Sequence, residues 1–557
     1  MVGKMRKLKS RSVFTSVALG VVLVAAIGFG TMVQQSGRAA GVPGDVNNDN
    51  VVNVFDLSIL LNNWGMSGVS SDINNDSKVD VFDLSILLSG WGKTGPSPSP
   101  TPTPTPAATP TPPPAVSGTQ YYVSNSGSDS NTGKSPSAAW KTIGKVNSMT
   151  KSGAVKHGDG VAFERGGEFF GTIGGPGTSS SGAYLTISAY GAGPKPKITG
   201  YKVLSNASAW TNTGSNVWRI NIINGTSYTG ATPANLVNNN ADSAFLKVNG
   251  QIYGAKKWST SSLSSQWDFY SDSTYLYVKS SANPTTMASD LRVATDGVLV
   301  KGFSYIYLKG LELVGIGGHG YQQTGSNTKV EDNYFHEIGG SHLHETTRYG
   351  NGIEMWLGSK NAVIQNNEIA EVWDTAITIQ GENARSENIH FRNNKFWNTT
   401  QVFEYWTRGS GSTNGIYNSS FTDNVAVNAG YSWGYPHRPD KVGRGTFQMA
   451  YSQELGMSFN MSRNIFFNAR DNYAYSSPNA GKFRSGYVSD HNLIVLRSGE
   501  KIVAQLSYTF EQHAAYISAT GQEKASTWML LPSSASTPQG ALDYVNANLS
   551  TLKGMIR

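Results

Sequence analysis

Short runs in which apolar and polar residues alternate fill the chain from about residue 119 to residue 500, and Gly, Asn, Ser and Asp separate these runs. Alternation with a period of two predicts strands, and this stretch shows no helical period. An asparagine recurs in it at intervals of about 30 residues, and an apolar residue mostly follows it two positions later. These asparagines are Asn333, Asn367, Asn394, Asn424, Asn464 and Asn492.

A repeat of this length predicts a β-solenoid. One coil cannot bury its apolar face alone, so successive coils stack into one long core. We expect each asparagine to lie in a tight turn, where its side chain bonds the turn of the next coil. Steps longer than the others indicate loops inserted into single coils, and inserted loops often carry binding residues.

This pattern resembles the right-handed parallel β-helix of the pectate-lyase-like superfamily. Residues 121–129, 158–168 and 189–194 look like segments of many secreted β-helix enzymes. The resemblance implies an all-β, right-handed parallel β-helix over residues 119–500. It leaves the reaction open, because this superfamily contains lyases, hydrolases, epimerases and adhesins. Two helical stretches follow, so we expect residues 501–557 to form a helical cap or tail.

The first 40 residues read as an export signal. Basic residues precede an apolar run from about Val13 to Val33, and this run is long enough to span a bilayer. The segment fits a cleaved signal peptide and an N-terminal membrane anchor. We therefore expect a secreted or cell-surface protein that contacts a membrane only through this segment, if the segment stays uncleaved.

The net charge of +7 comes almost entirely from this segment, which carries Lys4, Arg6, Lys7, Lys9, Arg11 and Arg38 and no acid. The rest of the chain is nearly neutral, so the high pI gives no reason to expect a nucleic-acid partner. There is no cysteine, and aromatic residues reach 11% of the chain. A neutral surface rich in aromatic residues suits sugar binding better than phosphate or lipid binding.

Residues 41–93 contain one acidic pattern twice, and the second copy follows the first after 27 residues. Calcium takes six to eight oxygen ligands, and both copies place oxygen side chains at loop positions 1, 3, 5, 9 and 12. The predicted ligands are Asp45, Asn47, Asp49, Asn53 and Asp56 in the first loop, and Asp72, Asn74, Asp76, Asp80 and Asp83 in the second. Each loop leads into a short apolar helix that ends at a Trp-Gly pair.

This duplicated loop-helix unit resembles a type I dockerin. The resemblance implies a module that binds two calcium ions and docks into a cohesin on another protein. Position 6, where the family has Gly, is Asn50 in one copy and Ser77 in the other. Serine tolerates a left-handed backbone less well than asparagine, so we expect the second site to be weaker. Residues 94–118 form a Pro/Thr/Ser linker between this module and the β-helix.

Carboxylates and tryptophans align on the predicted coils. Strands superpose when the residue pairs 352–353, 376–377, 402–403 and 446–447 are matched, and the position after each pair points outward. That outward column reads Glu354, Thr378, Glu404 and Gln448, and the next outward column reads Trp356, Gln380, Trp406 and Ala450.

Glu354 and Glu404 are the main catalytic candidates, with Asp374 as a third. The two glutamates lie two coils apart, roughly 9–10 Å, which is close to the carboxylate spacing of inverting glycosidases. Two solvated glutamates that align by chance would look the same. We expect four neighbours to bind the sugar chain: Trp356, Trp406, Gln380 and Tyr405.

The longest step of the repeat, between Asn424 and Asn464, holds a basic and aromatic loop. A polysaccharide lyase must neutralise a uronate carboxylate and supply a base, and basic side chains do both. The loop therefore adds His437, Arg438 and Lys441 as catalytic candidates, and Tyr431, Trp433 and Arg444 as substrate-binding candidates. A plain basic surface loop has the same composition. His342 and His344, on another insertion, are expected to wall the groove rather than to bind zinc.

These features predict an exported enzyme that cleaves a polysaccharide in a groove on a parallel β-helix. The paired glutamates favour hydrolysis, whereas the basic loop favours β-elimination. A non-catalytic glycan-binding or adhesive β-helix is the alternative. The predicted cofactor is Ca²⁺, with two ions in the dockerin-like module and a further one in the β-helix left open. The predicted partners are the polysaccharide and a cohesin.

Overall fold

The computed structural model describes residues 43–46, 52, 54–67, 71–93, 115–176, 182–236, 240–411, 413–453, 456–476 and 486–556. The chain divides into two compact units, Met1–Pro112 and Pro113–Arg557. The predicted export segment and residues 94–114 of the predicted linker lie outside the described residues. Within the described part of the chain, no helix is long and apolar enough to cross a membrane.

The smaller unit contains two helices, α1 (Val54–Asn62) and α2 (Val81–Ser89). Both lie where the duplicated pattern predicts them. Asp80 caps α2 by accepting a hydrogen bond from the backbone of Phe82, which satisfies one of the unpaired N–H groups at the start of a helix. A small core holds the unit together: Val46, Val52, Leu60, Val79 and Leu87 are all buried.

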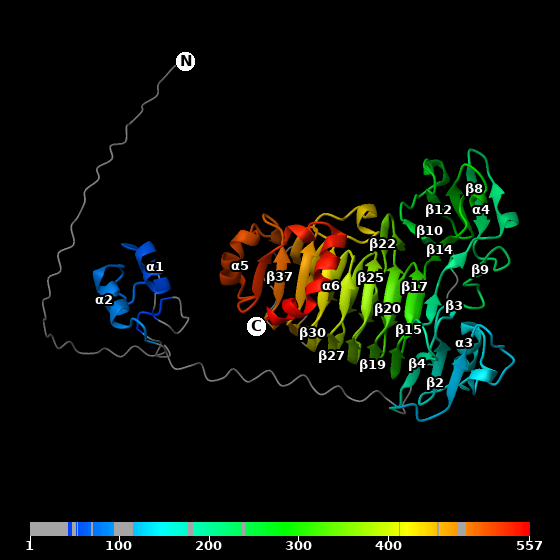
Figure 1. The fold of residues 1–557 in the computed structure, drawn as a ribbon, viewed down its shortest axis with the longest axis horizontal. Helices are drawn as coiled ribbons and strands as arrows, with labels where there is room; N and C mark the ends of the chain where they lie inside the picture. The colour runs from blue at the N-terminus through cyan, green and yellow to red at the C-terminus, as the bar shows by residue number, and fades with distance from the viewer. Residues whose placement is uncertain are drawn as a thin grey trace, which may run out of the picture. The chain divides into compact units, whose positions relative to one another are not determined.

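The larger unit is a parallel β-helix with three faces (Figure 1). From β16 to β38, each coil contributes one strand to each face, in the order first, second and third sheet. The first sheet contains β1 (Gln120–Val123), β2 (Gly160–Glu164), β4 (Leu185–Tyr190), β16 (Ile306–Lys309), β19 (Ser326–Glu331), β24 (Lys360–Gln365), β27 (Arg385–Arg392), β30 (Gly415–Thr422), β33 (Gly456–Ser462) and β36 (Tyr487–Asp490).

The second sheet contains β3 (Glu168–Phe170), β5 (Lys197–Thr199), β17 (Glu312–Ile316), β20 (Tyr334–Ile338), β25 (Glu368–Val372), β28 (Lys395–Trp397), β31 (Val425–Ala429), β34 (Ile465–Ala469), β37 (Leu493–Leu496) and β39 (Thr527–Leu530). The third sheet contains β15 (Val298–Gly302), β18 (His319–Gln323), β23 (Ile353–Trp356), β26 (Thr375–Glu382), β29 (Gln401–Arg408), β32 (Thr446–Gln453), β35 (Asn472–Ser476) and β38 (Lys501–Val503). The fold class predicted from the sequence is therefore confirmed.

The repeated asparagines form a ladder in the turn between the first and second sheets. The backbone N–H of each donates to the side-chain oxygen of the asparagine in the next coil, over 2.9–3.0 Å. Asn492 ends the ladder by donating to Ser526 and to the buried Glu523. The residue before each asparagine has a left-handed φ of 55–60°. The ladder thus provides hydrogen-bond partners for the buried backbone N–H and side-chain amide groups of these asparagines.

Helices cover both ends of the core and part of one face. α3 (Ile143–Lys151) places Ile143 and Val146 on the core at the N-terminal end, and α5 (His513–Thr520) places Tyr516 at the other end. α6 (Pro538–Gly554) lies in front of the second sheet in Figure 1 and packs on β31 and β34. The prediction of a helical cap or tail after residue 500 is therefore only partly correct, because this segment also contains β38 and β39, which extend the solenoid.

An insert interrupts the β-helix between β5 and β15, where the sequence analysis expected continuous coils. Its two antiparallel sheets enclose a separate core. One sheet contains β6 (Lys202–Val203), β9 (Thr229–Gly230), β10 (Ser243–Val248), β11 (Gln251–Tyr253) and β14 (Leu291–Thr295); the other contains β7 (Thr211–Asn212), β8 (Val217–Asn221), β12 (Phe269–Ser271) and β13 (Tyr275–Lys279), and the helix α4 (Pro284–Met287) follows β13. Short antiparallel and parallel strands show the same alternation, so the pattern did not separate them.

Candidate active site

The two glutamates lie on the outward side of the third sheet, in the predicted register. Glu354 of β23 pairs with Thr378 of β26, which pairs with Glu404 of β29. Their neighbours along each strand point inward: Ile353, Met355, Phe403 and Tyr405 are fully buried in the core. The alternation along the strands therefore places both carboxylates outside the solenoid.

The predicted register fails at the fourth strand. Phe403, and not Glu404, is the partner of Gln448 in β32, and the ladder shifts between Tyr405 and Trp406. Gln448 bonds Tyr473 and Tyr487 of the core, and Ala450 is itself part of the core, so neither belongs to the outward columns. Met449 takes the place opposite Glu404. The error arises because this coil carries the longest insertion, which allows the alignment to slip by one residue.

Glu354 is buried and is held by donors from two coils. Its carboxylate accepts hydrogen bonds from Gln322 (2.6 Å) and Asn351 (3.4 Å), and His319 Nε2 lies 3.2 Å from it. The backbone N–H of Asn351 donates to His319 Nδ1, so His319 carries its proton on Nε2 and donates it to Glu354. Glu354 thus has three polar neighbours, His319, Gln322 and Asn351.

Glu404 has a different environment. It is half-buried, and Gln380 donates to it over 2.7 Å. Burial, reinforced by the nearby charge of Asp374, raises the pKa of Glu404 from 4.5 to about 8, although Arg444 and Arg438 act in the opposite direction. Glu404 therefore holds a proton at neutral pH, while Glu354 is surrounded by donors.

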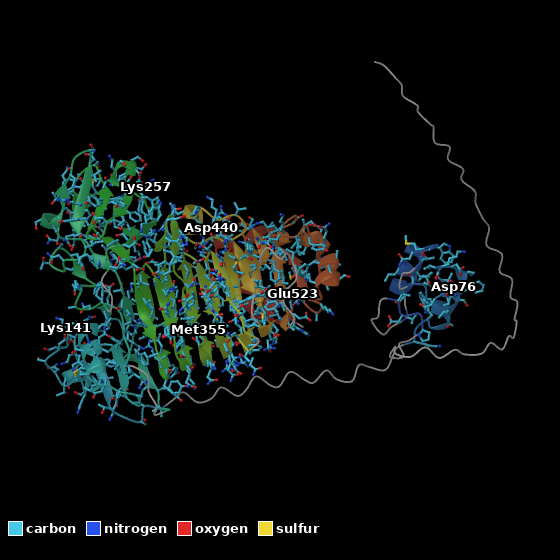
Figure 2. All side chains as sticks on the ribbon, turned by 180° about the vertical axis from the view of Figure 1, so that it is seen from behind. Asp76, Lys141, Lys257, Met355, Asp440 and Glu523 are labelled. Carbon is cyan, nitrogen blue, oxygen red and sulfur yellow. The ribbon has the colours of Figure 1, made fainter. Side chains whose placement is uncertain are left out.

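The loop between β31 and β32 contributes an ion-pair network beside Glu404. Arg438 is buried and binds Asp374 (2.7 Å) and, through two hydrogen bonds, Asp440. Arg444 lies 3.4 Å from Asp440. The guanidinium of Arg438 thus forms ion pairs with two carboxylates. In Figure 2, Asp440 of this loop and Lys257 of the insert lie toward the same edge of the solenoid.

An aromatic pair lies beside the carboxylates. The rings of Trp356 and Trp406 are 6.2 Å apart and nearly parallel, with an interplanar angle of 7°. Both are half-buried and outward-facing, and Gln380 lies on the strand between them. Such rings offer flat apolar surfaces that match the C–H face of a sugar.

Three aromatic candidates have other positions. Tyr405 is fully buried in the core, so its prediction as a substrate-binding residue is wrong. Tyr431 accepts a hydrogen bond from Arg497, which follows β37, and its ring centroid lies 5.6 Å from the guanidinium of Arg470. Trp433 is wedged between Trp373 (5.4 Å) and Phe245 of the insert (4.6 Å). It anchors the loop instead of facing the carboxylates.

The remaining basic candidates lie on the outer side of the site. His437 contacts the insert near Gly254, and partial burial together with the charges of Arg348 and Lys441 lowers its pKa to about 4. Lys441 donates to the carbonyl of Pro436. The exposed His342 and His344 lie on a hairpin formed by β21 (Ser341–His344) and β22 (Thr347–Tyr349).

Sequence reasoning missed His319, Gln322 and Asn351. Gln322 is the partner of Glu354 on β18, so one further coil in the alignment would have found it. That coil precedes the first repeated asparagine, which is where the alignment began. His319 is the first residue of β18 and Asn351 lies just before β23, and neither belongs to the outward columns that the sequence analysis aligned.

The second acidic loop of the smaller unit makes the tight turn at position 6 that a calcium-binding loop requires. Ser77 at position 6 has a left-handed φ of 71°, and Asp72 accepts hydrogen bonds from the backbone of Asp76 and Ser77. Burial raises the pKa of Asp83, but four backbone N–H donors outweigh it and lower that pKa overall. Asn47, Asp49 and Asn53 of the first loop lie outside the described residues.

The all-oxygen donor set and the tight turn at Ser77 fit a calcium ion. Nevertheless, no three His, Cys, Asp or Glu side chains converge as a metal-binding group anywhere in the described ranges. The two calcium ions of the dockerin-like module therefore stay a prediction, and a further ion in the β-helix stays open.

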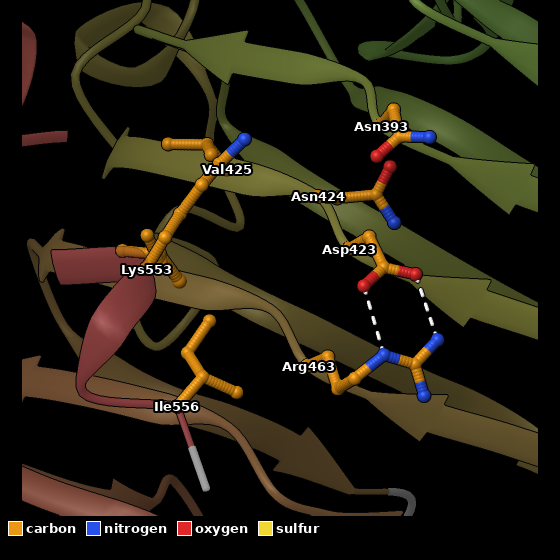
Figure 3. A pocket seen from close by; sticks show the side chains of 8 residues that line it. Asn393, Asp423, Asn424, Val425, Arg463, Lys553 and Ile556 are labelled. Atoms are coloured by element: carbon orange, nitrogen blue, oxygen red, sulfur yellow. Dashed lines mark hydrogen bonds and ion pairs between the residues drawn. The ribbon is translucent and has the colours of Figure 1, made fainter. Parts of the chain in front are cut away.

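A separate pocket of about 200 Å³ lies beside the asparagine ladder, under the end of α6 (Figure 3). Asp423 and Arg463 line it and bind each other through two hydrogen bonds. Asn393, Asn424 and Lys553 also line this pocket.

Comparisons with known proteins agree with the fold. Residues 275–472 match the family model described as right handed beta helix region. No curated protein matches the sequence. The chain therefore contains a right-handed parallel β-helix.

Several solved structures have a similar fold. XylC, solved in complex with xylose, is 14% identical with a TM-score of 0.42, over 69% of this chain and 66% of that chain. The pectate lyase Pel9A is 14% identical with a TM-score of 0.35, over 71% and 79%. A GH136 lacto-N-biosidase from Eubacterium ramulus is 12% identical with a TM-score of 0.34, over 74% and 68%. This chain thus spans slightly under two thirds of XylC, and the likeness concerns the fold alone.

Proposed function

We propose that this protein is an exported glycoside hydrolase that cleaves a polysaccharide between Glu404 as general acid and Glu354 as general base. The observation that carries the proposal is the unlike environment of two carboxylates in one outward column. Burial and Asp374 raise the pKa of Glu404, whereas Glu354 accepts a hydrogen bond from Gln322 and lies 3.2 Å from His319 Nε2. A carboxyl that keeps its proton can act as the acid, and a second carboxylate on the same face can act as the base.

Spacing favours hydrolysis with inversion. Two coil steps of about 4.8 Å separate Glu354 from Glu404, which leaves room for a sugar and a water molecule between them. In this mechanism Glu404 protonates the glycosidic oxygen of the leaving group. Glu354 removes a proton from the attacking water on the opposite face of the ring.

Elimination has less support. A lyase needs a cationic group to neutralise the uronate carboxylate of its substrate. Arg438, the strongest candidate for that role, is buried and already bound to Asp374 and Asp440. The basic loop therefore serves to position Asp374 beside Glu404.

Two substitutions test these roles. Glu404→Gln should lower cleavage of a polysaccharide roughly 100-fold or more, yet leave substantial activity on an aryl glycoside whose phenolate departs without a proton. Glu354→Gln should lose both activities, because both need an activated water. Full activity of Glu404→Gln on the polymer would exclude the proposed acid. Glycan binding without cleavage of any polymer by the wild-type protein would indicate a non-catalytic binding protein.

We also propose that residues 43–93 bind two calcium ions and dock into a cohesin. Equivalent apolar residues are exposed in both copies: Leu61 and Leu88 at 53% and 52%, and Trp64 and Trp91 at 46% each. A duplicated apolar surface on so small a unit suits a protein partner. Export through the N-terminal segment would bring the enzyme to an extracellular substrate.

A further inference from the structure

The insert reaches the rim of the candidate active site through one exposed tryptophan. Trp258, which follows β11, is 40% exposed. It is the only tryptophan in the described part of the larger unit that is so exposed. Single exposed apolar residues are common on protein surfaces, so its contacts decide whether it has a role.

The Trp258 ring is held in place from two directions. Lys256 Nζ lies 5.3 Å from the ring centroid, and the His342 ring packs against it edge-on at 5.3 Å. Lys256 is buried and forms an ion pair with Asp242. Asp242 also accepts the backbone N–H of His342 over 2.7 Å. One carboxylate therefore ties the insert to the hairpin that carries His342.

The same hairpin connects Trp258 to the catalytic pair. Tyr349 of β22 donates to Asp296 of the insert and packs its ring 5.2 Å from His319. His319 in turn lies 3.2 Å from Glu354. The position of the Trp258 ring relative to Glu354 is thus fixed through packed and hydrogen-bonded side chains.

Aromatic rings consequently flank the carboxylates on both sides. Trp356 and Trp406 lie two residues beyond Glu354 and Glu404 along their strands, whereas Tyr349 and the hairpin precede β23. Charges beside Trp258 are paired, as Lys256 with Asp242 and Lys257 with Asp268. A neutral ring that offers C–H groups and hydroxyls suits this surface better than an anionic group.

We infer that Trp258, with His342, forms a subsite for a neutral sugar residue on the side of the cleavage point opposite Trp356 and Trp406. This inference rests on the proposed function. It gives the insert a role in selecting sugar chains long enough to reach from one aromatic site to the other.

The test measures binding by calorimetry in a Glu404→Gln background, with xylo-, manno-, galacto- and gluco-oligosaccharides of two and of six sugars as probes. Trp258→Ala should weaken binding of the hexasaccharide about tenfold and leave the disaccharide unchanged. Trp258→Tyr should restore most of the loss. Met287→Ala, at another exposed apolar residue of the insert (42%), is the matched control and should change neither.

Unchanged hexasaccharide affinity in Trp258→Ala would overturn the subsite, and so would an equal loss for both lengths. Either outcome would reject the subsite only. The proposed hydrolase function would still hold if the wild-type enzyme releases reducing ends. Binding that depends on Trp258 without any turnover by the wild-type enzyme would reject the hydrolase and retain the subsite. If no probe binds the background protein, both proposals fail.

Discussion

Glu354 and Glu404 occupy equivalent outward positions on β23 and β29, yet their neighbours differ. Glu354 lies among His319, Gln322 and Asn351, which all come from turns or an adjacent coil. Glu404 has one strong donor, Gln380, and lies near the charge of Asp374. The repeating backbone supplies two equivalent positions, and the proposed mechanism uses the different neighbours of the two glutamates to give one the role of acid and the other the role of base.

The pH dependence of activity follows from Glu404. The acid must be protonated, so kcat/KM should fall as pH rises past about 8. Asp374→Asn removes a negative charge that raises this pKa and should move the fall to lower pH. The measurement is a pH–rate profile of both proteins. An unmoved or upward-shifted limb in the variant would show that Asp374 does not control the acid.

Stability should depend on the same group. Between about pH 4.5 and pH 8 the folded protein keeps a proton on Glu404 that the unfolded chain has released. The free energy of unfolding should therefore decrease as pH rises through this window. Urea denaturation of the wild type and Glu404→Gln at about pH 5 and about pH 8 tests this, and the variant should lose less stability between the two.

Alternation along the strands was enough to predict which residues of β23, β26 and β29 point outward. It did not reveal His319, the first residue of β18, or Asn351, which precedes β23, because neither belongs to the outward columns. It also contradicts the selection of Tyr405, which lies between Glu404 and Trp406 and must point inward.

At the scale of single elements, the asparagine ladder explains why the coils keep their register. Asn394→Ala should cost on the order of 2–3 kcal/mol, because Asn367 then loses the acceptor of two buried N–H donors. Asn460, an exposed asparagine of β33, is the matched control, and Asn460→Ala should change stability by less than about 0.5 kcal/mol. Chemical denaturation measures both. Equal effects would show that the ladder is not a stabilising element.

The outward tryptophans of β23 and β29 should contribute to binding more than to folding. Trp356→Ala combined with Trp406→Ala should weaken polysaccharide binding about tenfold with little change in melting temperature. Trp397, which is outward and half-buried on the second sheet, provides the control. Affinity electrophoresis in polysaccharide gels compares them, and similar retardation of the double variant and wild type would argue against an aromatic platform.

At the scale of the whole molecule, the division into two units was readable from the Pro-rich segment, and the β-helix from the repeated asparagines. The insert could not be predicted from the sequence, because apolar and polar residues alternate in the same way in antiparallel and in parallel strands. The wrong alignment at Gln448 has a related cause. An insertion changes the length of a coil, and a register shift of one residue moves every side chain of a strand to the opposite face.

Calcium should act on one unit only. A thermal scan of the full chain should contain a transition that moves to lower temperature with EDTA and a larger one that does not, because an ion bound only by the folded state stabilises that state alone. Asp72→Ala combined with Asp83→Ala should reproduce part of the EDTA effect. A scan that is insensitive to EDTA would contradict a calcium-binding module.

The most direct test of the central claim follows the products of the wild type, Glu354→Gln and Glu404→Gln on a panel of plant and microbial polysaccharides. The account predicts that the wild type releases reducing ends from at least one polymer without ultraviolet absorbance from unsaturated ends, and that both variants lose roughly 100-fold or more of this release. Unsaturated products, or release that both variants retain, would contradict it.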